Sequence, residues 1–419
     1  MELVMTMHSA TLAINEAIQK RRAAGEEVLH LGFGEAGLPV PDFIAEALRS
    51  AVGRNGYGAV VGSEEAREAA AGWFCRRGLA TEAGQIIFAP GSKALLFAAI
   101  AALPGDLILA RPSWVSYAAQ AALLGKPVVE VPIPARSGGI PDPALLESAI
   151  LEARARGGNP GILLLTVPDN PTGTVASEGD VRELCRIAEK YGLAVISDEI
   201  YAQTVHSGAS APSASAHLES RTIVTTGLSK SLALGGWRIG FARVPSNEWG
   251  DAVLQDMIGI ASEVWSSLAA PMQAVAAHVL SEPDAVREHI QRSTRLHATV
   301  ANAVCDEFLA VGAQCRRPEA GFYIYPDFEP VRATLERKGV RTSEELAAVL
   351  LDRYAVGVLP GAAFGDDASA LRARVATSLL YGTSEQERWA SLRAEDPLQL
   401  PWIAGSLEHL RAALQDLVS

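Results

Sequence analysis

The chain has 419 residues, and 36 basic against 48 acidic side chains give it a formal net charge of −12 at pH 7. Negative charge repels nucleic acids and anionic membranes, and no cluster of lysine and arginine is long enough to offset it. No uninterrupted run of about 18 apolar residues occurs, as a membrane-spanning helix requires. We therefore expect neither nucleic acid nor a membrane as a partner.

The cysteines and the first residues indicate a cytoplasmic protein. Cys75, Cys185, Cys305 and Cys315 lie far apart in the sequence and lack the paired spacing of a metal or redox site. Residues 1–10 carry no basic region followed by an apolar run, which a secretion signal would have. We expect reduced cysteines, no bound metal and a cytoplasmic location.

The first predicted element is a helix over residues 10–24. Leu12, Ile14 and Ile18 recur there at helical spacing, and Gly25 ends the pattern. A short apolar strand is predicted at residues 28–31, followed by a glycine-rich loop at 32–35.

Short apolar runs alternate with helical segments from there to about residue 279. Such alternation predicts a mainly parallel sheet with helices on both faces. The seven runs are Ile86–Phe88, Leu107–Ala110, Val128–Val131, Ile162–Val167, Ala194–Ser197, Ile223–Thr225 and Ile239–Ala242.

Long helices dominate the rest of the chain, with strand candidates at residues 322–325 and 357–359. This change in pattern predicts a second, smaller α/β domain. We place the large domain at residues 47–279, and form the small domain from residues 1–46 and 280–419.

Lys230 comes shortly after the predicted strand 223–225, where polar groups collect at the edge of a parallel sheet. A lone lysine is usually a surface residue. Arg238, between glycines eight positions further on, would place a fixed cation near the amine and favour its uncharged, nucleophilic form.

Two further polar groups follow apolar strands. Asp198 and Tyr201 follow the strand 194–197 and suit a heteroaromatic cofactor, with the carboxylate on a ring nitrogen and the phenol on a ring oxygen. Alone, each would be read as a helix cap or a core residue. Asn170, in a turn after the strand 162–167, could give that oxygen a second hydrogen bond.

The segment Gly91, Ser92 and Lys93 is a glycine turn that opens a helix. The free N–H groups and dipole of such a helix start favour an anion, commonly a phosphate. Trp114, after the strand 107–110, could stack on a planar ring or simply pack in the core.

In order and spacing, these segments resemble the class I/II aminotransferase family of fold-type I enzymes, which depend on pyridoxal 5′-phosphate (PLP). The resemblance runs from Gly34 to Arg374. It implies a mainly parallel seven-stranded sheet flanked by helices, plus a smaller α/β domain. It also implies transfer of the amino group of an L-amino acid to a 2-oxo acid, through a Lys230 aldimine and a pyridoxamine intermediate.

The resemblance also assigns roles to residues. Lys230 would hold PLP as a Schiff base, Asp198 would pair with the ring nitrogen, and Asn170 and Tyr201 would hold the ring oxygen. Trp114 would stack on the ring. The phosphate would be held by Gly91, Ser92, Lys93, Ser229 and Arg238, and by Tyr57 from a neighbouring subunit, which implies a homodimer with shared active sites.

In this family, an arginine in the C-terminal part of the sequence binds the α-carboxylate of the substrate through a planar two-point contact. Arg374 is the candidate here and Arg372 a close competitor, with the backbone of Gly34 across the substrate and with Trp114 and Asn170 beside it.

Two departures from the family pattern leave the reaction open. Gly227 stands where the family usually has serine, so Ser229, Thr226 or water must help hold the phosphate. The loop at residues 34–41 differs from the usual Gly-Glu-Pro-Asp sequence. The alternative is PLP-dependent elimination or replacement, cyclisation or carbon–carbon bond formation. A DNA-binding regulator or a metal hydrolase is disfavoured by the acidic composition and the scattered histidines.

Overall fold

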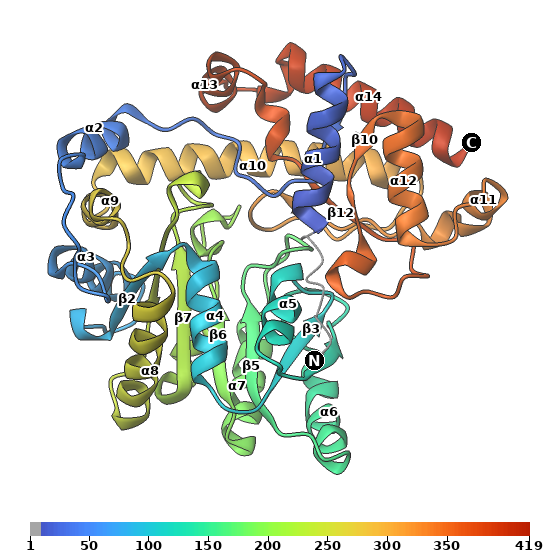
Figure 1. Ribbon diagram of the computed structural model, residues 1–419. Coiled ribbons are helices and arrows are strands. Elements are labelled where there is room, and N and C mark those ends of the chain that lie inside the picture. Colours follow the sequence, from blue (N-terminus) through green and yellow to red (C-terminus); the bar gives the residue numbers. More distant parts are fainter. Residues whose placement is uncertain (1–9) are drawn as a thin grey trace.

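The computed structural model describes residues 10–419 and is built around one large sheet (Figure 1). All seven predicted runs form strands of this sheet, in the order β2-β8-β7-β6-β5-β3-β4. Its members are β2 (Ile86–Pro90), β3 (Asp106–Arg111), β4 (Val128–Pro132), β5 (Pro160–Thr166), β6 (Ala194–Asp198), β7 (Thr222–Gly227) and β8 (Ile239–Arg243). The strand β8 runs antiparallel to β2 and β7, while the other neighbouring pairs are parallel.

Helices cover both faces of this sheet, because successive side chains of a strand point to opposite faces. In β3, Leu107 and Leu109 pack in one cluster and Ile108 in another. The first face is covered by α4 (Ser92–Ala102), α5 (Val115–Leu123) and α8 (Glu248–Val264). The second face is covered by α6 (Pro143–Ala155) and α7 (Glu178–Tyr191), and, towards β2 and β8, by α2 (Asp42–Ala51), α3 (Glu64–Cys75) and α9 (Ala270–Leu280).

The remaining elements surround two small sheets. One pairs β1 (Leu29–His30) with β10 (Val356–Gly357), and the other has the order β11-β12-β9, formed by β11 (Leu359–Pro360), β12 (Ala373–Ala376) and β9 (Tyr323–Ile324). The helices here are α1 (Ala10–Ala23), α10 (Asp284–Ala310), α11 (Arg332–Arg337), α12 (Ser343–Tyr354), α13 (Glu385–Arg393) and α14 (Pro401–Val418). In Figure 1, α10 runs across the molecule, and its residues Val286 and Leu296 pack in two different hydrophobic clusters.

The small strands agree only in part with the strands expected from the sequence. The strand expected at 322–325 is present as β9, whereas the one expected at 357–359 is divided between β10 and β11, which belong to different sheets. The strand β12 was not anticipated, because its four residues include the arginine Arg374. The helix expected at 10–24 is α1.

Within residues 10–419, no helix combines the length and the apolar character needed to cross a membrane. The expectation that the first ten residues carry no targeting signal concerns a segment of which residues 1–9 lie outside the described part of the chain.

Candidate active site

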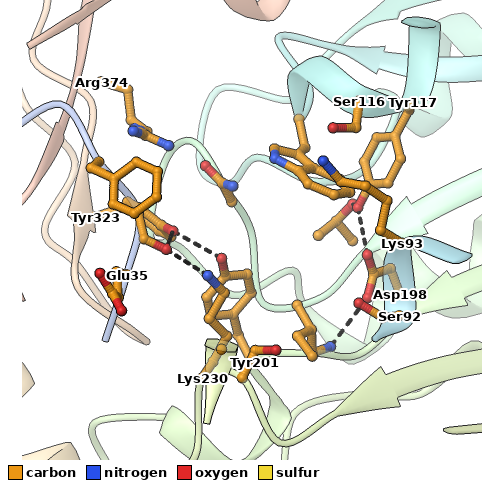
Figure 2. A pocket seen from close by; sticks show the side chains of 18 of the residues that line it. Glu35, Ser92, Lys93, Ser116, Tyr117, Asp198, Tyr201, Lys230, Tyr323 and Arg374 are labelled. Atoms are coloured by element: carbon orange, nitrogen blue, oxygen red, sulfur yellow. Dashed lines mark hydrogen bonds between the residues drawn. The ribbon is translucent and has the colours of Figure 1, made fainter. Parts of the chain in front are cut away.

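A cavity of about 450 Å³ lies where the carboxyl ends of β5, β6 and β7 meet the loop at residues 33–35 and the strands β9 and β12. Figure 2 shows Arg374 and Tyr323 across this cavity from Asp198 and Tyr117. The fold brings together eleven of the residues named from the sequence: Gly34, Ser92, Lys93, Trp114, Asn170, Asp198, Tyr201, Ser229, Lys230, Arg238 and Arg374.

Tyr57 does not line the cavity of its own chain, and its side chain is 97% exposed. The contact expected of it is with a neighbouring subunit. Gly91 lies just behind the cavity wall, against Arg238.

Lys230 points into the cavity rather than to the outer surface (Figure 2). Its Nζ atom donates a hydrogen bond of 2.6 Å to the backbone oxygen of Gly34. The same nitrogen lies 5.7 Å from the ring centre of Tyr201 and 5.8 Å from that of Phe322. Among residues 10–419, the amine therefore has one hydrogen-bond partner and lies beside aromatic rings, so it is free to form a bond with another group in the cavity.

Asp198 ends β6 and is buried, with 2% of its surface exposed. Burial raises the pKa of its carboxyl group to about 6, and the hydrogen bond from Tyr117 is the largest influence in the opposite direction. Tyr117 donates to Oδ2 at 2.8 Å, and the backbone N–H of Ile200 reaches Oδ1 at 3.3 Å. These two hydrogen bonds therefore fix the orientation of the Asp198 carboxylate, which lines the cavity.

Sequence reasoning missed Tyr117, although a signal existed. Tyr117 lies three residues after Trp114, so the two side chains share one side of the start of α5. Their rings meet edge to face, with centroids 5.2 Å apart. A residue that positions Asp198 thus comes from a helix adjoining the predicted ring-stacking tryptophan.

The start of α4 has the geometry that an anion site requires. Gly91 precedes the helix with φ of +88°, a conformation that glycine adopts readily. A Cβ atom at Gly91 would lie 2.3 Å from Nη2 of Arg238, so the glycine lets the guanidinium approach the helix start. Arg238 is fixed by a hydrogen bond of 2.8 Å to the oxygen of Gly235. Free N–H groups of the first turn and a fixed cation converge on one point.

Lys93 also turns its side chain into the cavity. Its Nζ atom lies 5.0 Å from the ring centre of Trp114. Burial lowers the pKa of Lys93, and the nearby charges of Arg238 and Lys230 lower it further. The cavity thus has an excess of positive charge on this side.

Asn170 and Tyr201 also line the cavity. The Oδ1 atom of Asn170 is buried and has no hydrogen-bond partner among residues 10–419. Tyr201 donates a hydrogen bond of 3.0 Å to the hydroxyl of Tyr323, which in turn lies 3.3 Å from the oxygen of Gly34. Tyr323 was seen in the sequence only as part of a predicted strand, so its place in the site was missed.

The two candidate arginines have different surroundings. Arg374 is buried, lines the cavity and donates to the oxygen of Gly32, while its Nε atom has no partner among residues 10–419. Arg372 faces a separate cavity and pairs with Asp327 at 2.7 Å and Asp366 at 3.1 Å.

Gly227 shows why the chain departs from the family pattern. A Cβ atom there would lie 2.6 Å from the backbone oxygen of Ile239, on the adjacent strand β8. Of the proposed substitutes, Ser229 lines the cavity, whereas the hydroxyl of Thr226 donates to the oxygen of Glu199 at 3.3 Å.

These residues fit PLP. Trp114 would lie beside a flat ring, and the buried Asp198 carboxylate would face its nitrogen. The start of α4 and Arg238 would hold the phosphate, and Asn170 and the Lys230 amine would face the ring substituents. The fold and the site together define a fold-type I PLP enzyme.

Comparison with known proteins gives the family. The model for aminotransferase class I and II matches residues 26–379. The aspartate aminotransferase of Geobacillus stearothermophilus is 30% identical over 381 residues, which cover 88% of this chain and 92% of that protein. The one from Streptomyces avermitilis is 32% identical over 372 residues, covering 85% of this chain and 87% of that protein.

Solved structures agree with the sequence relatives. The aspartate aminotransferase of Rhizobium meliloti has a TM-score of 0.83 at 27% identity and covers both chains fully (100%). That of Thermus thermophilus with maleate has a TM-score of 0.81 at 26% identity, with 97% of each chain covered. The chain belongs to the class I and II aminotransferase family and is an aminotransferase; the alternative PLP reactions are not favoured by these relatives.

Proposed function

We propose that this enzyme binds PLP at Lys230 and uses it to move the amino group of an L-amino acid to a 2-oxo acid. The observation that carries the proposal is the convergence of the Lys230 amine, the Asp198 carboxylate and the Arg374 guanidinium on one cavity. They provide an amine for the cofactor's aldehyde, a partner for its ring nitrogen and a site for the substrate carboxylate.

When bound, PLP supplies a carbonyl that accepts the amino group and a ring that delocalises the electrons left on the α-carbon. Asp198 would keep the ring nitrogen protonated, and Asn170 and Tyr201 would donate to the ring oxygen. The phosphate would be held by Gly91, Ser92, Lys93, Ser229 and Arg238, and Trp114 would cover the ring face.

The chain's own groups then act on the substrate. Arg374 would bind the α-carboxylate with two parallel N–H groups, since its Nε has no other partner among residues 10–419. The backbone of Gly34 lies across from it. The Lys230 amine, once released by the substrate, would carry a proton to and from the α-carbon, which general acid–base catalysis requires.

We also propose a homodimer, a cytoplasmic location and the domain boundaries given above, 47–279 and 1–46 with 280–419. The support for the homodimer is Tyr57, whose large aromatic side chain is 97% exposed and free to reach the phosphate of a second subunit. The support for the location is that all four cysteines are free thiols.

The substrates are open to a direct test. Relatives are named as aspartate or aspartate/prephenate aminotransferases, and the positive side of the cavity at Lys93 is compatible with an acidic side chain. We propose aspartate as the first amino donor to try, within a panel that also includes apolar and aromatic amino acids.

The test is a visible spectrum of the purified protein with PLP, followed by stepwise addition of each amino acid. We expect a visible band that is lost with one amino acid and restored with a 2-oxo acid. Lys230→Ala should abolish both the band and turnover, whereas Lys190→Ala, at a surface ion pair with Glu147, should change neither. Release of ammonia in place of a reversible cycle would refute the transfer reaction.

A further inference from the structure

A second cavity, of about 470 Å³, lies beside the active site and is lined mainly by polar groups. Its walls come from the ends of β3 and β4 with the residues that follow them, from residues 314–316, and from residues just outside the strands β9 and β12. The polar side chains on it are Arg111, Gln314, Cys315, Arg316, Tyr325, Asp327, Asp366 and Arg372. None of them is used by the proposed transamination.

The two cavities share one face of the small sheet. Tyr323 and Arg374 line the active site, whereas Tyr325 and Arg372 line the second cavity. Residues two apart on an extended strand point to the same side. The second cavity therefore adjoins the active site, two residues further along each of these chain segments.

Its charges are unevenly paired. Arg372 is neutralised, because it forms ion pairs with Asp327 and Asp366. Asp366 also accepts a hydrogen bond of 3.0 Å from Tyr325. Arg111 and Arg316 form no ion pair with any carboxylate of residues 10–419 within 4.0 Å. Three guanidinium groups therefore line the cavity together with two carboxylates, and both carboxylates already pair with Arg372.

Arg316 is the more informative of the two unpaired arginines. It is half-buried, and among residues 10–419 its side chain forms one hydrogen bond, from Nε to the oxygen of Ala135 at 2.8 Å. Burial lowers the pKa of Arg316 and the charge of Arg372 lowers it further, while Asp169, Cys315 and Asp327 act in the opposite direction. Arginine does not lose its proton in proteins, so a partly desolvated, unpaired guanidinium is costly unless an anion joins it.

We propose that this cavity binds a small dianion, a dicarboxylate or a phosphate compound, between Arg111 and Arg316. Guanidinium groups suit both anions because their N–H donors match the spacing of the oxygens. The carboxylates of the cavity face Arg372 and leave the Arg111–Arg316 side positive. A site of this kind is separate from the cofactor and substrate positions in the first cavity.

The position of this site connects it to the active site through short stretches of chain. Arg111 precedes Trp114 by three residues, and the N–H of the intervening Ser113 donates to the oxygen of Phe364 at 3.0 Å. Phe364 packs 5.2 Å from the guanidinium of Arg374. An anion at Arg111 therefore contacts the segment that carries Trp114, and this segment is linked to Arg374 through Phe364.

The proposal is tested by calorimetric titration of the PLP-loaded protein with inorganic phosphate and, separately, with malonate, at constant ionic strength. Arg316→Gln and Arg111→Gln should each weaken this binding by about tenfold or more, equivalent to about 1.4 kcal/mol. The matched control is Arg317→Gln, the next residue, which is exposed and pairs with Asp306 outside the cavity. Malonate can also bind Arg374 in the active site. The malonate affinity of each cavity variant is therefore compared with that of Arg317→Gln.

Weakened binding of either probe in both cavity variants, with normal binding in Arg317→Gln, supports the site and tells whether phosphate or carboxylate is preferred. Absence of saturable heat with both probes, or full affinity in either cavity variant, overturns the proposal. Unfolding temperatures without added anion, equal in all three variants, would show that the change is in binding. The measurement needs no turnover, so it does not depend on the proposed reaction.

Discussion

Tyr117 Oη donates a hydrogen bond of 2.8 Å to Oδ2 of Asp198, and Oγ1 of Thr166 lies 2.8 Å from the same phenol oxygen. All three side chains are buried. Burial raises the pKa of Asp198 to about 6 and the Tyr117 hydrogen bond opposes that rise. The phenol therefore helps to keep the carboxylate charged at the position where the cofactor's ring nitrogen is proposed to bind.

Tyr117→Phe should weaken PLP binding in a pH-dependent way. Without the phenol, the pKa of Asp198 moves further up, so at about pH 6.5 a smaller fraction is ionised and able to pair with the ring nitrogen. We expect PLP affinity to fall by about three- to tenfold there, and the difference from the wild type to shrink at about pH 8.5. Fluorescence titration with PLP across this range measures both.

Tyr191→Phe is the matched control, since Tyr191 donates to Glu147 far from the cavity at 2.6 Å. It should leave PLP affinity unchanged at every pH. If Tyr117→Phe lowers the affinity equally at all pH values, the phenol contributes packing alone and not the charge state of Asp198.

The residues predicted from the sequence share a simple origin. Lys230, Asp198 and Asn170 lie at or just after the carboxyl ends of buried parallel strands, and these ends meet at one edge of the sheet. Tyr117 and Tyr323 reach the same cavity from a helix and from the small sheet. Which side chains approach a site from a separate layer depends on long-range packing, which local periodicity does not encode.

The small strands were harder to predict for a related reason. Elements of two residues, such as β10 and β11, are too short to show the period-2 pattern of a strand. In β12 the buried Arg374 interrupts the apolar sequence. A functional residue thus obscured the very strand that positions it.

Arg374→Lys should impair substrate binding while the cofactor remains bound. Lysine keeps the charge but cannot offer two parallel N–H groups to a carboxylate. Losing one charged hydrogen bond, about 1.5–3 kcal/mol, predicts a fall in kcat/KM of about ten- to a hundredfold, mainly through a higher KM for the amino acid. Steady-state kinetics and a PLP spectrum together check both parts.

Arg372→Lys separates the two candidates. Its guanidinium pairs with Asp327 and Asp366 in the second cavity, so KM for the amino acid should stay within about threefold of the wild type. A large increase in KM in Arg372→Lys, with a normal value in Arg374→Lys, would transfer the carboxylate role to Arg372.

Gly227→Ser should destabilise the protein, although serine is the usual family residue there. The added Cβ atom would approach the oxygen of Ile239 to 2.6 Å, so the pairing of β7 with β8 must shift. We expect a loss of about 1–3 kcal/mol in the free energy of unfolding, typical of an overpacked site. Thermal or urea unfolding measures it.

Ser229→Ala gives the complementary result. Ser229 lines the cavity, and its removal should weaken PLP binding with little effect on stability. A variant Gly227→Ser that is as stable as the wild type and binds PLP more tightly would show that the family's phosphate contact can be restored in this chain.

We expect three buried carboxyl groups beside the site to make the cofactor-free protein less stable as pH rises. Burial raises the pKa of Asp169 and Glu199 to about 7 and that of Asp198 to about 6, from ordinary values of 3.8 for Asp and 4.5 for Glu. Between about pH 4 and 7 the folded chain therefore holds more protons than the unfolded chain, and stability contributed by these groups is lost as pH increases through this window.

Glu199→Gln isolates one of these groups. Hydroxyls of Ser197 and Ser213 donate to Oε1 of Glu199 at 2.8 and 2.6 Å, and a glutamine oxygen can accept both. The variant should match the wild type near pH 4.5, where Glu199 is protonated in the fold, and exceed it by about 2–3 kcal/mol near pH 7.5. Urea unfolding at several pH values, with the exposed Glu27→Gln as control, measures the difference. A constant difference across pH would mean that Glu199 is ionised throughout, held in that state by its serine hydrogen bonds.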